Sequence, residues 1–356
     1  METYARELIA ALYERGDVEM VAFVNRVAAA TPGPWNELAR QAPVPVDARR
    51  RTEWVRGEQQ HVPRLARAEG VDLVHSLAST APLHGPRPRV TTIHDLLFLK
   101  APEAHFGLMG LGMRVLVPLA AHRSDRVIAV SGSTAGDVAR HLRVPRSRID
   151  IVPEAADTAH RAVPDPESEL RVALGLGDRP VLLSVSAKRP HKNLLRLLGA
   201  LGRIPAERRP LLVLPGYPTP HEQELRTRAD ALRLTDDVRM PGWIGAGQLE
   251  GLYALARAFV FPSLYEGFGL PVLEALRRGL PVACSDRSSL PEVAGDAALL
   301  FEPTDEGAIA AALERVLVDE RLRERLRAAG RVQAARFTWA ATAAGTVESY
   351  RRALAR

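Results

Sequence analysis

The sequence holds a single cysteine, Cys284, so no disulfide can form within the chain and a cysteine-based metal cluster is excluded. No apolar run reaches the roughly 18 residues that a membrane-spanning helix needs. The most apolar stretch, 107–121, is shorter and carries Arg114. The first residues also lack the apolar segment of a secretory signal. These absences favour a protein of the reducing cytoplasm.

Lysine is scarce: Lys100, Lys188 and Lys192 are the only ones, although the formal net charge is +6. A basic balance is compatible with nucleic acid, an anionic membrane or a phosphorylated substrate. No arginine run is interleaved with aromatic residues, which disfavours nucleic acid. Asp-x-Asp, Gly-x-x-x-x-Gly-Lys-Ser/Thr, Gly-x-Ser-x-Gly and His-Glu-x-x-His are all absent. A carboxylate pair that grips Mg²⁺ or Mn²⁺ is therefore not indicated.

The chain of 356 residues is long enough for two domains. Short apolar strands alternate with helical patterns, which is typical of parallel sheets covered by helices. The segment 153–178, with three prolines, interrupts this alternation and reads as a linker. The strands expected before and after it are 18–24, 71–75, 90–93, 126–130, 180–186, 210–214, 258–261 and 280–284. Ligands of such sheets bind at the carboxyl ends of the strands.

One candidate site follows the expected strand 180–186, where Ser-Ala-Lys-Arg-Pro-His-Lys-Asn leads into a helix. Asn193 is a favourable N-cap, so Lys192 precedes a helix start whose N–H groups attract anions. Lys188 and Arg189 add positive charge to the same loop. The pattern predicts a phosphate or diphosphate site; the alternative is a solvated basic loop.

A second candidate follows the strand 258–261. Gly267 and Gly269 permit tight turns, and Pro271 suits the first turn of the helix after them. Glu274, expected in that first turn, and Glu266, before it, can accept hydrogen bonds from sugar hydroxyls. The alternative, a glutamate that complements the helix dipole, explains Glu274 but neither Glu266 nor the glycines.

A third candidate is His94, directly after the apolar strand 90–93. We expect it to face a crevice between the domains, with Asp95 orienting its ring. The alternative is a histidine satisfied by backbone groups at a strand end.

Taken in this order, the motifs resemble the retaining family 4 glycosyltransferases of the GT-B fold nearly end to end. The resemblance implies an α/β protein with two Rossmann-like, doubly wound parallel-sheet domains facing a crevice. We expect the N-terminal domain to span 1–158, joined by a C-terminal helix at 340–356, and the nucleotide-sugar domain to span 159–339. The similar segments are Thr91–Asp95, Asp125–Ser131, Ile149–Asp157, Pro190–Asn193, Tyr265–Glu274, Ser289–Ala298 and Phe337–Trp339.

The resemblance also implies roles for individual residues. Lys192 would hold the donor diphosphate and Glu274 the ribose, while His94 would line the acceptor side. Glu266 would bind donor-sugar hydroxyls, together with backbone N–H groups of Gly267, Phe268 and Gly269, and the N–H of Leu270 would meet the diphosphate. The family often has an arginine where Ser186 and Ala187 stand, so Lys188 or Arg189 is expected to substitute.

The implied reaction is transfer of a hexose from a nucleotide sugar, with GDP-mannose as our choice, to a sugar or lipid-linked acceptor. It is a front-face transfer with retention, with no metal and no other cofactor. The apolar and basic segment 101–119 offers a contact with the inner face of a membrane, or else forms core helices. A phosphorylase or an epimerase is a minor alternative.

The sequence departs from the family pattern at its start. Family members have a strand and a glycine-rich turn before the first helix, whereas residues 1–12 here already have the pattern of that helix. We expect the N-terminal sheet to lack this strand. Either the sequence starts inside a longer reading frame, or the protein is a catalytically impaired nucleotide-sugar-binding protein.

Overall fold

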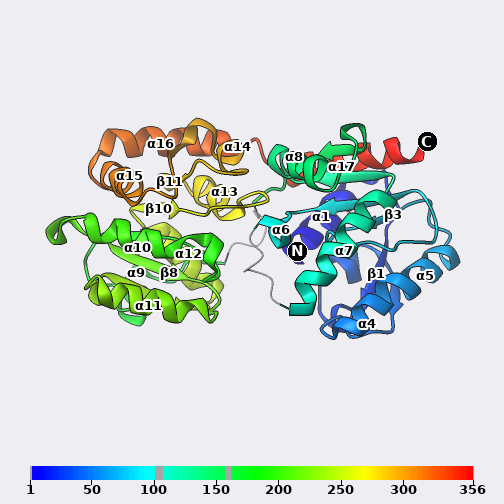
Figure 1. Ribbon diagram of the computed structural model, residues 1–356, viewed down its shortest axis with the longest axis horizontal. Helices are drawn as coiled ribbons and strands as arrows, with labels where there is room; N and C mark the ends of the chain where they lie inside the picture. Colours follow the sequence, from blue (N-terminus) through cyan, green and yellow to red (C-terminus); the bar gives the residue numbers. More distant parts are fainter. Residues whose placement is uncertain (1, 101–106, 157–161, 356) are drawn as a thin grey trace. The chain divides into compact units, whose positions relative to one another are not determined.

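The computed structural model describes residues 2–100, 107–156 and 162–355. It divides into two compact units, which we describe separately: unit 1 comprises Met1–Ala155 and Phe337–Arg356, and unit 2 comprises Ala156–Arg336. The C-terminal helix α17 (Trp339–Leu354), red in Figure 1, belongs with the blue N-terminal segments of unit 1. The expected boundary at 158/159 lies outside the described residues.

Unit 1 has two parallel sheets, β1-β2 and β3-β4-β5-β6. Its strands are β1 (Val21–Asn25), β2 (Arg40–Val44), β3 (Val74–Ser76), β4 (Arg89–Ile93), β5 (Arg126–Ala129) and β6 (Ile149–Ile151). Its other helices are α1 (Glu2–Arg15), α2 (Arg26–Ala30), α3 (Pro34–Glu37), α4 (Arg51–Arg56), α5 (Val62–Ala68), α6 (Leu97–Lys100), α7 (Gly107–Arg123) and α8 (Gly132–His141). A π-helical turn, Gly57–His61, joins α4 to α5.

The described strands of unit 1 form two separate parallel sheets rather than one. The chain starts with α1, and a cavity of about 1090 Å³ is lined by residues 18–25, which contain β1, and by residues 71–78, which contain β3. Both strands therefore have an edge that faces this cavity rather than another strand of the two sheets. Exposed strand edges of this kind carry backbone groups that need hydrogen-bond partners.

Unit 2 has one parallel sheet of six strands in the order β12-β11-β10-β7-β8-β9. These are β7 (Val181–Leu183), β8 (Leu211–Pro215), β9 (Val238–Gly242), β10 (Ala258–Phe261), β11 (Val282–Ser285) and β12 (Ala298–Phe301). Its helices are α9 (Glu167–Ala173), α10 (Leu194–Arg203), α11 (His221–Ala231), α12 (Ala246–Leu255), α13 (Leu270–Arg277), α14 (Leu290–Ala294), α15 (Glu306–Val318) and α16 (Glu320–Ala334). The predicted α/β class with parallel sheets is confirmed.

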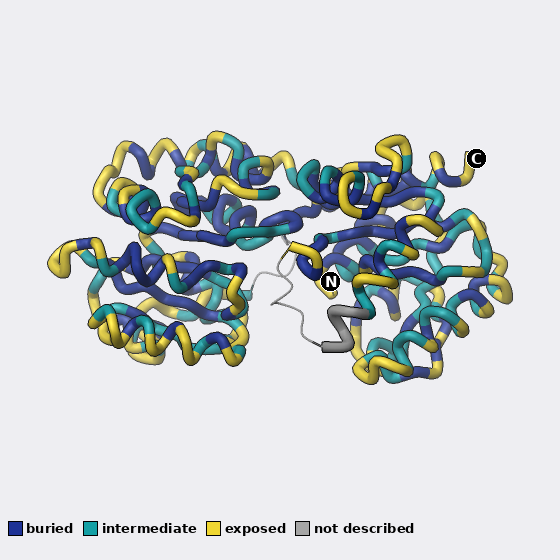
Figure 2. Tube along the Cα trace, viewed as in Figure 1, coloured by how far each residue is buried: buried dark blue, intermediate teal, exposed yellow. Residues whose placement is uncertain are grey.

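Figure 2 shows buried residues, in dark blue, inside each unit and exposed residues, in yellow, on its outside. The strands β4, β5, β7, β8, β10 and β11 are buried along their whole length, as expected for sheets covered by helices. In unit 2 the core joins apolar side chains of the strands to α10 and α15, among them Leu182, Leu197 and Leu313. Among the described residues, no helix combines the length and apolarity that crossing a membrane requires. Of the expected apolar segment 101–119, residues 101–106 lie outside the described residues and the rest belongs to α7.

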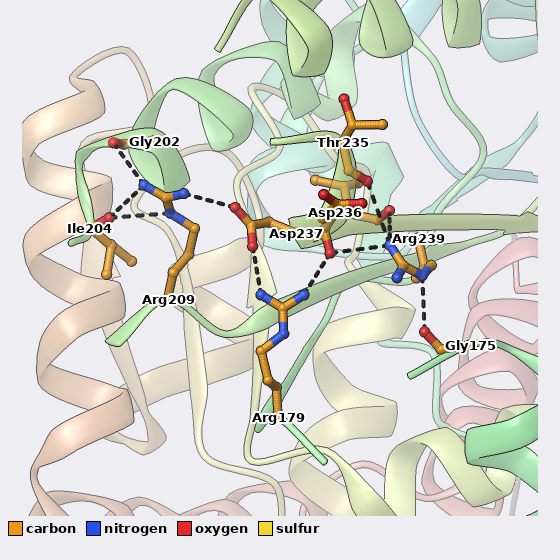
Figure 3. A network of polar contacts seen from close by, with 10 residues as sticks. Gly175, Arg179, Gly202, Ile204, Arg209, Thr235, Asp236, Asp237 and Arg239 are labelled. Atoms are coloured by element: carbon orange, nitrogen blue, oxygen red, sulfur yellow. Dashed lines mark hydrogen bonds and ion pairs between the residues drawn. The ribbon is translucent and has the colours of Figure 1, made fainter. Parts of the chain in front are cut away.

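The amino ends of three neighbouring strands of unit 2 are tied together by charge (Figure 3). Arg179, before β7, donates to Asp237 Oδ1 at 2.5 Å, and Arg209, before β8, donates to Asp237 Oδ2 at 2.7 Å. Burial alone would raise the pKa of Asp237, but these hydrogen bonds hold it below its usual range. Structural ion pairs therefore occupy the amino ends of these strands. A ligand site is expected at their carboxyl ends.

Candidate active site

The sheet of unit 2 has a topological switch point between β7 and β10. From β7 the chain proceeds outward to β8 and β9, and it then returns to β10 and proceeds the other way to β11 and β12. The loops that leave the carboxyl ends of β7 and β10 diverge to opposite sides, which opens a ligand site between them. These loops contain Lys192 and Glu266.

The loop after β7 ends in a short 3-10 turn, Pro190–Lys192, followed by Asn193 at the N-cap position of α10. Asn193 takes the predicted N-cap position, but its side chain makes no capping hydrogen bond. Asn193 has a left-handed backbone (φ 59°), and its amide donates to the carbonyls of Pro262 at 3.0 Å and Pro303 at 2.7 Å. Asn193 therefore fixes the position of Lys192 relative to the loop after β10.

The loop after β10 enters α13 through Gly269, which has φ 106°, and Pro271 lies in the first turn, as predicted. A Cβ on Gly269 would lie 2.6 Å from Leu290 Cδ2, so both the backbone angle and the space require glycine. The N–H of Leu270, at the start of α13, has no acceptor within the part of the chain that the structure describes. It is available to an anion.

Two serines that sequence reasoning did not single out hold this loop in place. The N–H of Glu266 donates to Ser288 Oγ at 2.9 Å. The hydroxyl of Ser289, which is fully buried, donates to the carbonyls of Glu266 at 3.1 Å and Phe268 at 2.7 Å. The backbone around Gly267 is thereby presented in one conformation.

Lys192 and Glu266, expected to bind different parts of a ligand, contact each other. Lys192 Nζ lies 2.6 Å from Glu266 Oε1, and the two side chains are 16% and 13% exposed. Lys192 Nζ also lies 5.2 Å from the centroid of the Phe261 ring. The pair places a cation and a hydroxyl acceptor side by side at the switch point, beside the start of α13.

Glu274 lies in the second turn of α13 rather than in the first, since the helix begins at Leu270. It is therefore not a dipole-complementing residue of the first turn. Glu274 Oε2 accepts a hydrogen bond of 3.1 Å from the hydroxyl of Tyr253 on α12. Burial raises the pKa of Tyr253 well above its usual value, and the nearby Glu274 charge adds to this, so the phenol stays a donor. Tyr253 was not predicted, because nothing in its helical pattern marks it.

Lys188 and Arg189 differ in their exposure to solvent. Lys188 is fully buried, and its Nζ donates to the carbonyl of Gly216 at 2.8 Å. Burial lowers its pKa to about 8. Arg189 is exposed. Of the two residues expected to replace the family's arginine, only Arg189 presents its charge at the surface.

His94 lies in unit 1, directly after β4. Its Nδ1 lies 2.6 Å from Glu154 Oε1, and its Nε2 lies 2.8 Å from the carbonyl oxygen of Leu77. The prediction that Asp95 orients the ring is wrong: Asp95 Oδ1 accepts instead from the N–H of Leu97 at the start of α6. The two contacts hold the imidazole ring between Glu154, after β6, and the backbone after β3.

Among the described residues, no group of three or more His, Cys, Asp or Glu side chains could hold a metal ion.

Comparisons with known proteins decide the family. A model described as "Glycosyltransferase Family 4" matches residues 1–160, and one described as "Glycosyl transferases group 1" matches residues 167–333. An O-antigen chain mannosyltransferase B of Escherichia coli is 33% identical over 74% of this chain and 70% of its own length. The chain belongs to the family 4 glycosyltransferases.

Other relatives carry similar names. The glycosyltransferase described here is 34% identical to an E. coli serotype-specific mannosyltransferase, WbdA, over 76% of this chain but 34% of that protein. It is 32% identical to an MMP alpha-(1->4)-mannosyltransferase of Mycolicibacterium hassiacum over 66% of this chain and 56% of that protein. These matches make the chain a hexosyltransferase with mannosyltransferase homologues.

Solved structures confirm the predicted GT-B fold. A sucrose-phosphate synthase from Thermosynechococcus elongatus has a TM-score of 0.76 at 22% identity, with 99% of this chain and 93% of that chain covered. HepE from Anabaena, in complex with UDP and glucose, has a TM-score of 0.73 at 19% identity, covering 97% of this chain and 95% of the other. At these identities the likeness concerns the fold alone.

Proposed function

We propose that this glycosyltransferase moves a hexose, with mannose from GDP-mannose as the first choice, to a sugar acceptor with retention of configuration and without a metal ion. The Lys192–Glu266 pair at the switch point of unit 2 carries the proposal. The names of the mannosyltransferase relatives support the sugar, and the UDP-glucose complex of Anabaena HepE supports a nucleotide-sugar donor.

In this proposal the donor lies across the two loops. Its diphosphate accepts hydrogen bonds from Lys192 and from the N–H of Leu270, so it displaces Glu266 as the partner of Lys192. Glu266 is then released to accept from hydroxyls of the donor sugar, and Glu274, positioned by Tyr253, accepts from the ribose. Hydrogen bonds to ionised groups are stronger than those between neutral groups, which suits a site that must hold a flexible nucleotide sugar.

In the reaction step the protein mainly supplies positive charge that stabilises the departing diphosphate. The bond between the sugar C1 and the diphosphate oxygen breaks, and its electron pair stays on that oxygen. The acceptor oxygen forms its bond to C1 from the same face, and its proton goes to the departing diphosphate oxygen. Lys192 and the start of α13 stabilise the negative charge as it develops.

The acceptor in this proposal is a sugar or a lipid-linked sugar. A lipid-linked sugar at a membrane surface is consistent with α7, where Arg114, Val115 and Leu119 are all exposed. Flotation with vesicles that contain anionic lipid tests this contact. A protein that stays at the bottom of the gradient in low salt would contradict it.

Two matched pairs of variants test the proposal. Lys192→Met and Glu266→Gln alter the site, whereas Arg325→Met and Glu324→Gln remove a positive and a negative charge at exposed positions of α16. With GDP-mannose, in the presence of EDTA, Lys192→Met should lower kcat by about 100- to 1000-fold, the range for loss of one charge-stabilising donor. The α16 variants should keep wild-type activity.

Three measurements accompany the kinetics. A thermal-shift screen of nucleoside diphosphates and nucleotide sugars identifies the donor, because a ligand that binds the folded state raises its stability. NMR of the product gives the anomeric configuration. Nucleotide binding without transfer or hydrolysis for any donor would refute the enzyme, and an inverted product would refute the mechanism.

A further inference from the structure

A buried ion pair joins α12 to the end of α13 in unit 2. Glu250 lies on α12, and Arg278 directly follows α13. Arg278 Nε donates to Glu250 Oε2 at 2.9 Å, and its Nη2 donates to Glu250 Oε1, so the pair is bidentate. Each side chain is only 13% exposed. A buried pair is often no more stabilising than apolar residues in its place, so stability alone does not account for it.

The same guanidinium lies against the ring of Tyr253. Arg278 Cζ is 4.4 Å from the centroid of that ring, within the range of a cation–π contact. Phe259 also stacks on Tyr253, with the ring centroids 6.0 Å apart, and Tyr253 is 1% exposed. The ring is therefore fixed by a cation and by an apolar neighbour, which sets the direction of its hydroxyl.

Arg278 acts on Glu274 in two ways. Its Nη1 donates to the backbone carbonyl of Glu274 at 3.1 Å, and its own backbone N–H donates to the same carbonyl at 3.2 Å. The side chain of Glu274 is held through Tyr253, whose hydroxyl donates to Oε2 at 3.1 Å. Burial would lower the pKa of Arg278, but its hydrogen bonds with Glu250 and the nearby negative charges raise it, so the group stays a cation.

The fixed position of Glu274 matters for a ligand with hydroxyl groups. A carboxylate has several acceptor sites, so the bond from Tyr253 occupies only part of its capacity. A side chain that is already ordered loses little rotamer freedom when a ligand binds. A site built to bind a hydroxyl rejects an analogue that lacks it, because the acceptor is then left unpaired. The contacts of Arg278 therefore bear on how strictly a sugar hydroxyl is required.

We propose that Glu250 and Arg278 are positioning residues that give the donor site its preference for ribose over deoxyribose. The inference rests on the proposed function, in which Glu274 accepts from the ribose. Glu250 fixes the guanidinium of Arg278, Arg278 fixes the ring of Tyr253, and the hydroxyl of Tyr253 orients the carboxylate. Neither Glu250 nor Arg278 has to touch the donor for this effect.

The experiment measures the Kd of GDP and of dideoxy-GDP by calorimetry, with UDP and dideoxy-UDP alongside because the base of the donor is itself proposed. The readout is the ratio of the two Kd values for one base. The wild type should prefer the ribose form by about 10- to 100-fold, the range for a hydrogen bond to a charged group. The double variant Glu250→Gln/Arg278→Met removes both charges together, so no lone buried charge remains. It should lower the ratio by about 10-fold and leave the Kd of the dideoxy form unchanged.

A matched control makes the same chemical changes in another buried pair. Arg209 and Asp237 are each 14% exposed, and they lie at the amino ends of the strands. Asp237→Asn/Arg209→Met should therefore keep the wild-type ratio. A second control repeats the Glu250 and Arg278 changes in a Tyr253→Phe background. There they should have no further effect on the ratio, because the chain of contacts is already broken.

Arg278→Lys gives a second route if the double variant does not fold. It keeps a cation for Glu250 but not the planar group that lies on the Tyr253 ring, so it should lower the ratio as well. A wild-type ratio in either variant, or additive effects in the Tyr253→Phe background, would overturn the inference alone. A wild-type protein that binds none of the four nucleotides, or that binds ribose and dideoxy forms equally, would refute the proposed role of Glu274 and the inference with it.

Discussion

Replacing Lys188 by methionine tests the finding that this lysine is buried in unit 2. Burial lowers its pKa from 10.5 to about 8. Between these two values the unfolded chain holds a proton that the folded protein has released, so the free energy of unfolding rises with pH. At 1.36 kcal/mol per pKa unit, Lys188 should add roughly 2 to 3 kcal/mol to the stability of unit 2 between pH 7 and pH 10.

The assay must follow unit 2 alone. Trp243 is the only tryptophan in the sequence of unit 2, because Trp35, Trp54 and Trp339 belong to unit 1. Labelling with 5-fluorotryptophan and following the ¹⁹F signal of Trp243 during urea unfolding therefore reports unit 2. The wild type should gain roughly 2 to 3 kcal/mol relative to Lys188→Met when the pH is raised from 7 to 10.

The comparison isolates one group, since every other titrating residue is common to both proteins. Lys100→Met, which removes a lysine from unit 1, should leave the pH dependence of the Trp243 signal unchanged. Parallel stability curves for the wild type and Lys188→Met would refute the reasoning. They would mean that the amine of Lys188 reaches solvent and keeps an ordinary pKa.

Two further changes probe the loop after β10 and its neighbours. Tyr253→Phe removes the hydroxyl that donates to Glu274 while it keeps the ring, so donor binding measured by calorimetry should weaken by about 10-fold, the effect of one hydrogen bond to a charged group; an unchanged Kd would contradict a positioning role. Gly269→Ala introduces a Cβ 2.6 Å from Leu290 Cδ2 at φ 106°, so thermal unfolding should show a loss of about 2 kcal/mol, and a variant as stable as the wild type would show that the turn tolerates a side chain.

The strands that could be predicted are those in the middle of the sheets. β4, β5, β8 and β10 are apolar runs buried on both faces, and they lie within a residue or two of the expected ranges. β2, β6, β9 and β12 were not predicted. All four lie at the edge of a sheet, and β2 and β9 contain a proline, which is tolerated there.

The site was predictable as a set of residues but not as a set of contacts. Lys192, Glu266 and Gly269 all lie at the carboxyl ends of neighbouring strands, as the motifs indicated. Their pairing was not predictable, because Lys192 and Glu266 are far apart in sequence and each matched a different part of a ligand. The acceptor for Lys188, the carbonyl of Gly216, belongs to the loop after β8, and no spacing in the sequence relates the two.

The same limit applies to His94. The sequence places His94 at the end of β4. Asp95 was expected to orient its ring because it is the next residue in the sequence, but the carboxylate in contact with the ring is that of Glu154. Asp95 is used by the backbone of the next turn, and Glu154, after β6, takes the ring nitrogen instead. Backbone N–H groups at a helix start compete for a nearby aspartate, and here they win.

Asn193 sets a requirement for anyone who would transplant this site to another scaffold. One amide group ties the loop after β7 to the carbonyl of Pro262, after β10, and to that of Pro303, after β12. Copying Lys192 and Glu266 alone would reproduce the charges without the two Asn193 hydrogen bonds that set their spacing. A designer therefore has to carry over three loops and the asparagine between them as one indivisible piece.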